Sequence, residues 1–379
     1  MTLPTPDHCP QTTVAIVGGG LAGLALAILL GREGVPTTVL EQADYPRHKV
    51  CGEYVSRESL PFLERLGIPL NEYALPFIDR FTLTTTYGWQ ASCRLRPGGL
   101  GISRFLLDDL LARQARSCGV LIRTNTRVQQ IRRNPESGSF LLQTAQGEDL
   151  ASRFVVGAYG RVSGLSSAGR SPAPKFFGVK YHVCDGPPDN HIEIHHFPGG
   201  YCGISRIEAD RFCLCYLATA DRLRPFRGDI PAFEANVLAT NPFLRRRLAA
   251  PRVMDGVRTA HLRFGIPDPT QTPYPVLGDA AGFIPPITGN GMSLAFRSAH
   301  ALFPALMQSL EQPSGADLAL SANHTYIHRY LDHRIRRGVF LQQLLLHPNR
   351  PLNRLISYGL THLPVLSFMT RQATGDTFR

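Results

Sequence analysis

Three glycines near the start of the chain have the spacing of a phosphate-binding turn. Gly18, Gly20 and Gly23 lie between the apolar run TTVAIV and a stretch of helix-forming leucines and alanines. In a strand–turn–helix unit such glycines allow the tight turn, the approach of a pyrophosphate to the backbone, and close packing of helix on strand. Glu41 ends the next predicted strand, about 20 residues later, where a carboxylate accepts hydrogen bonds from ribose hydroxyls. The pattern predicts a βαβ unit that binds a dinucleotide.

A second glycine-rich segment, GDAAGFIPPITGNGM, is suited to hold the rest of such a cofactor. Gly278 and Asp279 form a turn after an apolar strand, which places the carboxylate where it can bind the hydroxyls of a polyol. A helix opens downstream, and its first backbone N–H groups come from Gly289, Asn290, Gly291 and Met292. The positive end of a helix stabilises negative charge, such as that at the N1–C2 carbonyl locus of a reduced flavin. The two segments together favour FAD.

The stretch KVCGEYVS follows the first βαβ unit and contains a cysteine, Cys51. Three roles are open for it: a reactive thiol, a wall of a cofactor pocket, or a small buried side chain. By residue type alone, a lone cysteine is most often a small buried hydrophobic residue.

The segment HIEIH places His191, Glu193 and His195 on one face of a predicted strand. Such a trio suggests a metal site, but no further ligand follows at a suitable spacing. We therefore interpret this face as polar and solvent-exposed, and we expect no metal.

The charge of the chain favours an anionic partner. The 379 residues contain 40 Lys and Arg against 29 Asp and Glu, a formal net charge of +11. Candidates are a phosphate-bearing cofactor, an acidic carrier protein or a membrane surface; no nucleic-acid module is recognisable, so we expect no nucleic-acid partner.

The eight cysteines lack the spacing of a disulfide framework, and no signal or spanning segment is apparent. We expect a cytoplasmic protein, possibly peripheral to a membrane.

The order of predicted elements indicates an α/β protein with a Rossmann-like FAD-binding domain, a second domain built on an antiparallel β-sheet, and a helical C-terminal tail. Alternating apolar segments such as FTLTTTYGW and RFCLCYLAT predict the sheet. The expected FAD-binding domain is discontinuous and comprises residues 1–75, 100–171 and 263–300. Residues 76–99 and 172–262 form the expected substrate-binding sheet domain, and residues 301–379 the C-terminal helices.

The quoted motifs resemble a superfamily of FAD-dependent enzymes that includes p-hydroxybenzoate-hydroxylase-type (group A) monooxygenases, flavin-dependent halogenases and geranylgeranyl reductases. The resemblance covers nearly the whole chain. VAIVGGGLAGLALAILL is similar to the ADP-binding motif, and GDAAGFIPPITGNGM to the motif that holds ribityl and flavin through Asp279. ISRFLLDDLL resembles a helix whose arginine, here Arg104, approaches the FAD.

YPRHKVCGEYVS looks most like the geranylgeranyl-reductase branch. In that branch a basic residue, here Arg47, and a Cys-Gly pair follow the first βαβ unit and line the substrate side of the flavin. The resemblance thus implies that Cys51 and Gly52 are cavity residues. Gly282 also resembles this branch, because the aromatic hydroxylases usually have a histidine at that position. Two features depart from the patterns: Tyr159 stands at the aspartate position of the hydroxylase motif, and the reductases' aromatic motif is reduced to Pro198 and Tyr201. Halogenases of this superfamily have a W-x-W-x-I-P motif, which needs two tryptophans, whereas this chain has only Trp89. We therefore set halogenation aside.

These features predict an FAD-dependent oxidoreductase acting on a hydrophobic lipid, isoprenoid or polyketide-like substrate. The leading reaction is geranylgeranyl-reductase-like hydride transfer to a C=C bond, with Tyr201 or water as the acid. The alternatives are a monooxygenase that hydroxylates an aromatic or polyketide substrate, and a non-redox flavoprotein. Since no second G-x-G-x-x-G unit occurs, NAD(P)H is expected only as a transiently docked electron donor.

Overall fold

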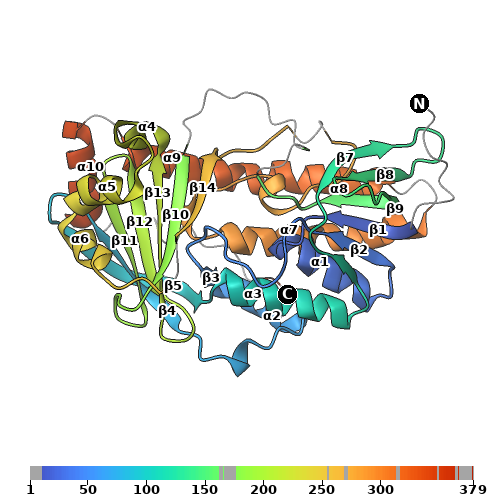
Figure 1. Ribbon diagram of the computed structural model, residues 1–379, viewed down its shortest axis with the longest axis horizontal. Helices are drawn as coiled ribbons and strands as arrows, with labels where there is room; N and C mark the ends of the chain where they lie inside the picture. The colour runs from blue at the N-terminus through green and yellow to red at the C-terminus, as the bar shows by residue number, and fades with distance from the viewer. Residues whose placement is uncertain are drawn as a thin grey trace.

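The structure is a computed structural model that describes residues 11–161, 165, 176–253, 256–268, 272–312, 316–347, 350–362, 366 and 378. It contains two β-sheets at opposite ends of the molecule, with helices between and around them (Figure 1). The predicted fold class is confirmed: one half is built on a mainly parallel sheet, the other on a mainly antiparallel sheet, and the C-terminal region is helical.

The first sheet has the strand order β6-β2-β1-β9-β8-β7. Its central strands β2, β1 and β9 run in parallel, as does β6, whereas β8 and β7 form an antiparallel extension. Val14 and Ile16 of β1 belong to the core on one face, and Ala15 and Val17 to the core on the other. Helices cover both faces of such a sheet, so its strands are continuously apolar. The strands are β1 (Gln11–Val17), β2 (Thr37–Leu40), β6 (Leu121–Arg123), β7 (Val128–Arg133), β8 (Phe140–Thr144) and β9 (Leu150–Gly157).

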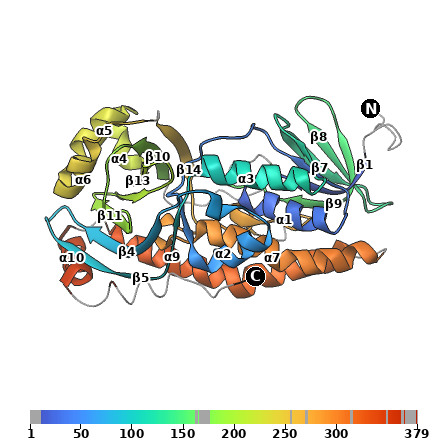
Figure 2. The ribbon, with the colours of Figure 1, turned by 90° about the horizontal axis from the view of Figure 1, so that it is seen from below.

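Three helices pack beside one another on one face of this sheet: α1 (Leu21–Arg32), α3 (Arg104–Ser117) and α7 (Gly291–Glu311) (Figure 2). Helix α1 is buried from Leu21 to Leu30, which explains its nearly continuous apolar sequence. Helix α3 begins after Ser103, whose hydroxyl caps it by accepting a hydrogen bond from the backbone N–H of Leu106 at 3.0 Å. The short α2 (Leu60–Arg65) joins the same core through Phe62 and Leu63.

The second sheet has the order β14-β10-β13-β12-β11-β4-β5-β3. All its pairs are antiparallel except β11 with β4. The strands are β3 (Tyr54–Ser56), β4 (Phe77–Thr84), β5 (Gln90–Gly101), β10 (Phe176–Val183), β11 (His191–Phe197), β12 (Gly200–Arg206), β13 (Phe212–Thr219) and β14 (Val257–Leu262). The predicted domain boundaries stay a prediction, although β3 adds residues from before position 76 to this sheet.

The two faces of the second sheet have different partners. One face packs around Phe233 of α5 (Ile230–Asn236) and Leu244 of α6 (Pro242–Leu248), near the short α4 (Ala220–Leu223). The other face meets residues of the segment before α7 and of the C-terminal helices, including Phe283, Leu345 and Leu360. The second face is therefore the one that can enclose a ligand held by the first half.

The C-terminal region consists of α8 (Ala316–Tyr326), a single π-helical stretch (Ile327–Leu331), α9 (Asp332–Leu345) and α10 (Arg350–His362). Helix α10 lies at the end of the molecule that holds the second sheet (Figures 1 and 2). Among the helices that the structure describes, none combines the length and the apolar character needed to cross a bilayer.

Candidate functional site

The predicted cofactor segments meet at the carboxyl edge of the first sheet. Gly18 follows β1, Tyr159 follows β9, and Asp279 follows Val276, which pairs in parallel with Gly157. The carboxyl ends of parallel strands share one edge, where open α/β sheets bind their ligands. The structure thus brings together three segments that are distant in the sequence.

The glycines at this edge fall into two groups. At Gly18 and Gly23 a Cβ atom would lie 2.4 Å from the Ala158 oxygen and 2.1 Å from the Gly18 oxygen, so glycine is required for packing. At Gly20 the nearest described atom to a Cβ would be the Lys49 Nζ, at 3.7 Å, and at Gly291 the nearest would be an Ile284 methyl, at 3.9 Å. Packing does not require glycine at these last two positions, which leaves their backbone open to a ligand. FAD fits both places, as the sequence predicts.

Glu41 is buried at the end of β2, next to the glycine turn. Its carboxylate accepts hydrogen bonds from the backbone N–H groups of Gly19 at 2.7 Å and Ala43 at 3.1 Å, and pairs with Arg47 at 2.6 Å. Although burial opposes it, the hydrogen bond from Arg47 and the charges of Lys49 and Arg47 lower the pKa of Glu41. The structure therefore places the Arg47 guanidinium against Glu41, the carboxylate predicted to bind the ribose. Arg47 helps to keep this carboxylate ionised.

Lys49 and Tyr45 also flank the turn, and the sequence reasoning missed both. The Tyr45 hydroxyl donates to the Gly19 oxygen at 2.6 Å, and the Lys49 ammonium lies beside Gly20. Burial lowers the pKa of Lys49 to about 8, against the attraction of Asp108. An anionic pyrophosphate beside Gly20 would stabilise this ammonium. The run of basic residues after the first βαβ unit is the signal that could have identified Lys49.

Arg104 and Asp279 lie near one another but have separate ion-pair partners. Arg104, in the first turn of α3, forms two bonds with the buried Asp108, at 2.6 and 2.8 Å. Asp279 pairs with Arg161 at 3.2 Å. Burial raises the pKa of Asp279, while the charges of Arg161, Arg104 and Lys49 act in the opposite direction. The site therefore combines Asp279 with three cations, a suitable environment for the phosphate and polyol parts of FAD.

The loop before α7 has the geometry expected of an anion-binding helix start. Gly289 has a φ of 68°, in the left-handed region that favours glycine, and α7 begins two residues later. Asn290 and Met292 are buried, and Asn290 makes no side-chain cap hydrogen bond within the described structure. The first N–H groups of α7 are therefore not capped by this side chain.

The two predicted catalytic residues, Cys51 and Tyr201, approach the same region from different halves of the molecule. The Cys213 thiol donates to the Cys51 carbonyl oxygen at 3.3 Å, and Tyr201 pairs with Leu217, which lies on the same face of β13 as Cys213. Burial raises the pKa of the Cys51 thiol, so the group is a neutral thiol at physiological pH. The Tyr201 hydroxyl donates to Oε1 of Gln342 at 3.4 Å and hydrogen-bonds to the backbone of Ile287, in the loop before α7.

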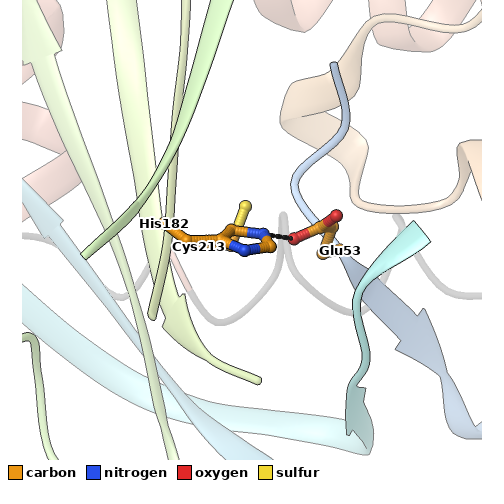
Figure 3. Close-up of side chains that lie close together, drawn as sticks. All are labelled: Glu53, His182 and Cys213. Atoms are coloured by element: carbon orange, nitrogen blue, oxygen red, sulfur yellow. Dashed lines mark hydrogen bonds and ion pairs between the residues drawn. The ribbon is translucent and has the colours of Figure 1, made fainter. Parts of the chain in front are cut away.

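A buried ion-pair network that sequence reasoning missed lies beside Cys51. One oxygen of the Glu53 carboxylate binds the Lys180 ammonium at 2.6 Å and accepts the Arg104 backbone N–H at 2.9 Å. The other oxygen lies 2.7 Å from the His182 Nε2 (Figure 3). Despite the cost of burial, the His182 hydrogen bond and the Lys180 charge lower the pKa of Glu53. Lys180 and His182 are alternate residues of β10, and two polar residues at this spacing in an apolar strand were the available signal.

The same network includes the one described group of side chains with a metal-ligand composition. The ligand atoms of Glu53, His182 and Cys213 all lie within 4.8 Å of one another. The Lys180 ammonium binds the Glu53 carboxylate and would repel a metal cation at short range. We therefore interpret the group as an internal ion-pair network that joins the loop after the first βαβ unit to the second sheet.

The predicted solvent-exposed face at HIEIH is wrong. His195 is buried, and its Nδ1 lies 2.8 Å from the Thr84 hydroxyl. Arg247 of α6 binds both oxygens of Glu193, at 3.0 and 3.1 Å. Even though burial opposes it, the hydrogen bonds from His195 and Arg247 lower the pKa of Glu193 to about 2. The face is covered because α6 folds back over the sheet, which the local pattern did not indicate.

Gly282 has a packing explanation. A Cβ atom there would lie 2.6 Å from an Ile335 methyl and 3.0 Å from a Leu331 methyl, both at the start of the C-terminal helices. These atoms are ends of flexible side chains, so the helix contact favours a small residue at position 282 without requiring glycine.

Comparison with known proteins agrees with this geometry. Residues 11–179 match the family model described as FAD binding domain. This part of the chain is therefore similar to FAD-binding domains. The match spans β1 to β10 and so includes the glycine turn, Glu41 and Arg104.

The curated proteins that are similar to this chain are distant relatives and carry diverse names. Conditioned medium factor receptor 1 of Dictyostelium discoideum is 24% identical over 84% of this chain and 66% of its own length. Dialkyldecalin synthase of Streptomyces rugosporus is 28% identical over 43% of this chain and 35% of its own. Menaquinone reductase of Mycobacterium tuberculosis is 25% identical over 45% of this chain and 40% of its own. The chain thus spans less than two thirds of the length of each relative.

Two solved structures have the same fold over almost the whole chain. A geranylgeranyl bacteriochlorophyll reductase-like protein from Thermoplasma acidophilum matches with a TM-score of 0.76 and 15% identity, covering 96% of this chain and 100% of its own. The flavin-dependent brominase Bmp2 matches with a TM-score of 0.74 and 18% identity, covering 97% and 94%. At this identity the likeness concerns the fold alone.

The first prediction concerns FAD retention. Gly20→Val inserts a branched side chain where the pyrophosphate would contact the backbone, and Asp279→Ala removes a polyol hydrogen bond, so each variant should lose most of its FAD. The measurement is the flavin-to-protein absorbance ratio after purification. Asp317→Ala, at an exposed position of α8, is the control and should retain the wild-type ratio. Full flavin content in both test variants would refute the cofactor site.

The second prediction concerns the Glu53 network. Lys180→Met keeps the volume but removes the lysine charge from the buried Glu53 carboxylate, whose other partners are His182 and the Arg104 backbone N–H, so it should lower the free energy of unfolding by about 3–5 kcal/mol. Urea denaturation followed by circular dichroism measures the change. Adding Glu53→Gln to this variant should restore part of the loss, because the uncompensated charge is removed. Arg113→Met, which breaks an exposed pair with Asp109, should cost about 1 kcal/mol or less. Equal effects of Lys180→Met and Arg113→Met would contradict a buried charge network.

Proposed function

We propose that this flavoprotein reduces a carbon–carbon double bond of a hydrophobic lipid, isoprenoid or polyketide-like substrate. The observation that supports this most directly is the apolar composition of the region between the second sheet and the loop before α7. Side chains from the sheet, the loop and the C-terminal helices form one apolar cluster there, which we call the roof cluster: Leu83, Phe176, Ile194, Tyr201, Leu217, Leu262, Phe283, Leu345, Leu360 and Leu366, with Ile287 and Ile356 packed against it. Such surroundings favour an apolar substrate and exclude water.

FAD held by the glycine turn, Glu41 and Asp279 would, once reduced by an electron donor, supply a hydride to one carbon of the double bond. The second carbon then needs a proton, and Tyr201 is the candidate donor within the roof cluster. Burial raises the pKa of the Tyr201 phenol well above its ordinary value, so the hydroxyl remains protonated. Its hydrogen bonds to Gln342 and to the Ile287 backbone orient it, and the phenol regains its proton from solvent once the product has left and the site is open. The substrate gains two hydrogens and the reduced cofactor is oxidised, so atoms and electrons balance.

Cys51 fits this reaction as a wall of the site. Its thiol is neutral, and its carbonyl oxygen accepts the Cys213 thiol at 3.3 Å. A Cβ at the neighbouring Gly52 would have no described atom within 4 Å, so the Cys-Gly pair leaves free space on this side. The names of a menaquinone reductase and a geranylgeranyl bacteriochlorophyll reductase-like protein among the similar proteins add support for reduction.

The third prediction separates reduction from the alternative reactions. Holoenzyme photoreduced without oxygen is mixed with an isoprenoid alkene such as geranylgeraniol, and the product is analysed by mass spectrometry. We expect a product that has gained two hydrogens in a single turnover without oxygen. A product formed only after oxygen is admitted, with one added oxygen atom, would establish a monooxygenase. Conversion to an isomer with the flavin still reduced would establish a non-redox role.

Tyr201→Phe tests the proton donor in the same assay. We expect the single-turnover rate to fall by about 10²-fold with FAD content unchanged, because the acid is lost and the ring is kept. Tyr73→Phe, which alters a tyrosine packed against the helices of the FAD-binding half, is the control and should leave the rate unchanged. An unaffected rate in Tyr201→Phe would assign protonation to water.

The fourth prediction concerns the electron donor, which we propose is NAD(P)H docked transiently at the flavin. Support comes from the single dinucleotide turn in the sequence and from Tyr159, which replaces the hydroxylase acid and packs in the core on the other face of the first sheet. Stopped-flow reduction of the bound FAD by NADH and NADPH should therefore be slow and unsaturated at micromolar donor without substrate. Fast, saturable and substrate-independent reduction would reveal a formed nicotinamide site and contradict this proposal.

A further inference from the structure

Helix α10 has apolar side chains on both of its faces. Ile356 and Leu360 point inward and join the roof cluster. Leu352, Leu355 and Tyr358 lie on the outside with 41%, 65% and 48% of their surface exposed, at the three-residue spacing of one helix face. Large apolar side chains that stay exposed in a row mark an interaction surface rather than chance exposure.

The turn between β4 and β5 extends this surface. Trp89 packs edge-on against Tyr358 and His362, with ring centroids 5.6 and 5.5 Å apart, and Tyr87 lies 5.1 Å from Trp89 with 37% of its surface exposed. The Arg354 guanidinium lies over the rings of Tyr87 and Trp89, at 5.8 and 5.9 Å. We call the set Leu352, Leu355, Tyr358, Tyr87, Trp89, Arg354 and His362 the α10 face.

The charge around the α10 face selects an anionic partner. The sequence of α10, RPLNRLISYGLTH, contains two arginines, Arg350 and Arg354, and no acidic residue. Juxtaposed basic residues attract anionic lipid headgroups, and aromatic rings with leucines insert at the boundary between headgroups and acyl chains. An acidic protein would match the charge, but it would not account for the row of leucines as well as a bilayer does.

We propose that the α10 face docks on an anionic phospholipid bilayer, and that an apolar substrate passes from that bilayer into the flavin site. The second part rests on the proposed function, whereas the first does not. The inner face of α10 and the flavin-side residues Phe283 and Ile287 belong to the same apolar cluster. A lipid leaving the bilayer at α10 would therefore stay among apolar side chains on its way to the flavin.

The fifth prediction tests docking by sedimentation of the holoprotein with vesicles. Vesicles of phosphatidylcholine with phosphatidylglycerol should bind the wild type at least about tenfold more tightly than phosphatidylcholine alone, and salt should weaken the binding. Leu352→Glu combined with Leu355→Glu should reduce binding to the anionic vesicles at least about tenfold, because two carboxylates replace the inserting side chains. Leu121→Glu is the matched control: Leu121 is 59% exposed but belongs to the first sheet, at the other end of the molecule (Figure 1). FAD content and melting temperature establish that each variant is folded.

The fluorescence of Trp89 reports on the same surface, since it is the single tryptophan of the chain. Its emission should shift to the blue with anionic vesicles and be quenched by brominated lipids. Absent vesicle binding, vesicle binding that the paired Leu variant leaves unchanged, or an emission that stays constant on bound vesicles would each overturn the proposal. Binding to an acidic protein but not to vesicles would do the same.

Failure of docking and failure of the proposed reaction are distinguishable. If the enzyme binds vesicles but reduces no alkene, docking stands and the reaction is wrong. If it reduces an alkene in detergent micelles, the paired Leu variant should keep that activity and lose only turnover of substrate embedded in vesicles.

Discussion

The carboxylate of Glu53 is the point at which the two halves of the molecule are joined. It lies on the loop that leaves the first βαβ unit, and it accepts hydrogen bonds from Lys180 and His182 of the second sheet and from the first residue of α3. A buried charge is tolerated only when it is paired and hydrogen-bonded, so these partners must hold their positions together. The loop that carries Cys51 and Gly52 is thereby held against β10, and Gly178 of β10 packs close to Val50.

This junction separates two kinds of surroundings. On the side of the glycine turn, cations predominate: Arg47, Lys49, Arg104 and Arg161 surround the acids Glu41, Asp108 and Asp279. On the side of the second sheet, the roof cluster is almost entirely apolar. FAD matches this gradient, because its charged pyrophosphate would lie among the cations and its isoalloxazine ring would face the apolar roof cluster. The same gradient continues outward to α10, where apolar side chains become exposed again.

The packing around the flavin site also explains which glycines in the sequence indicated a bound ligand. Gly20 and Gly291 are glycines without a packing reason, and a ligand accounts for them. Gly282 packs against the methyl ends of Ile335 and Leu331, which favours a small residue there. Two glycines in one motif can thus have unrelated causes, which only the surrounding atoms distinguish.

The sequence by itself determined the first βαβ unit, the FAD-binding half and the presence of a second sheet. These follow from local physics: the tight turn needs glycine at Gly18, and buried strands need continuous apolar residues. Only the tertiary structure decided that Lys180, 127 residues away in sequence, binds Glu53, and that α6 covers the histidines of β11. Contacts of this kind depend on which strand faces which loop, and strand alternation alone does not say what lies opposite either face. For the same reason the sequence could name Tyr201 as an acid, whereas its partners Gln342 and Ile287 came from the packing of distant segments.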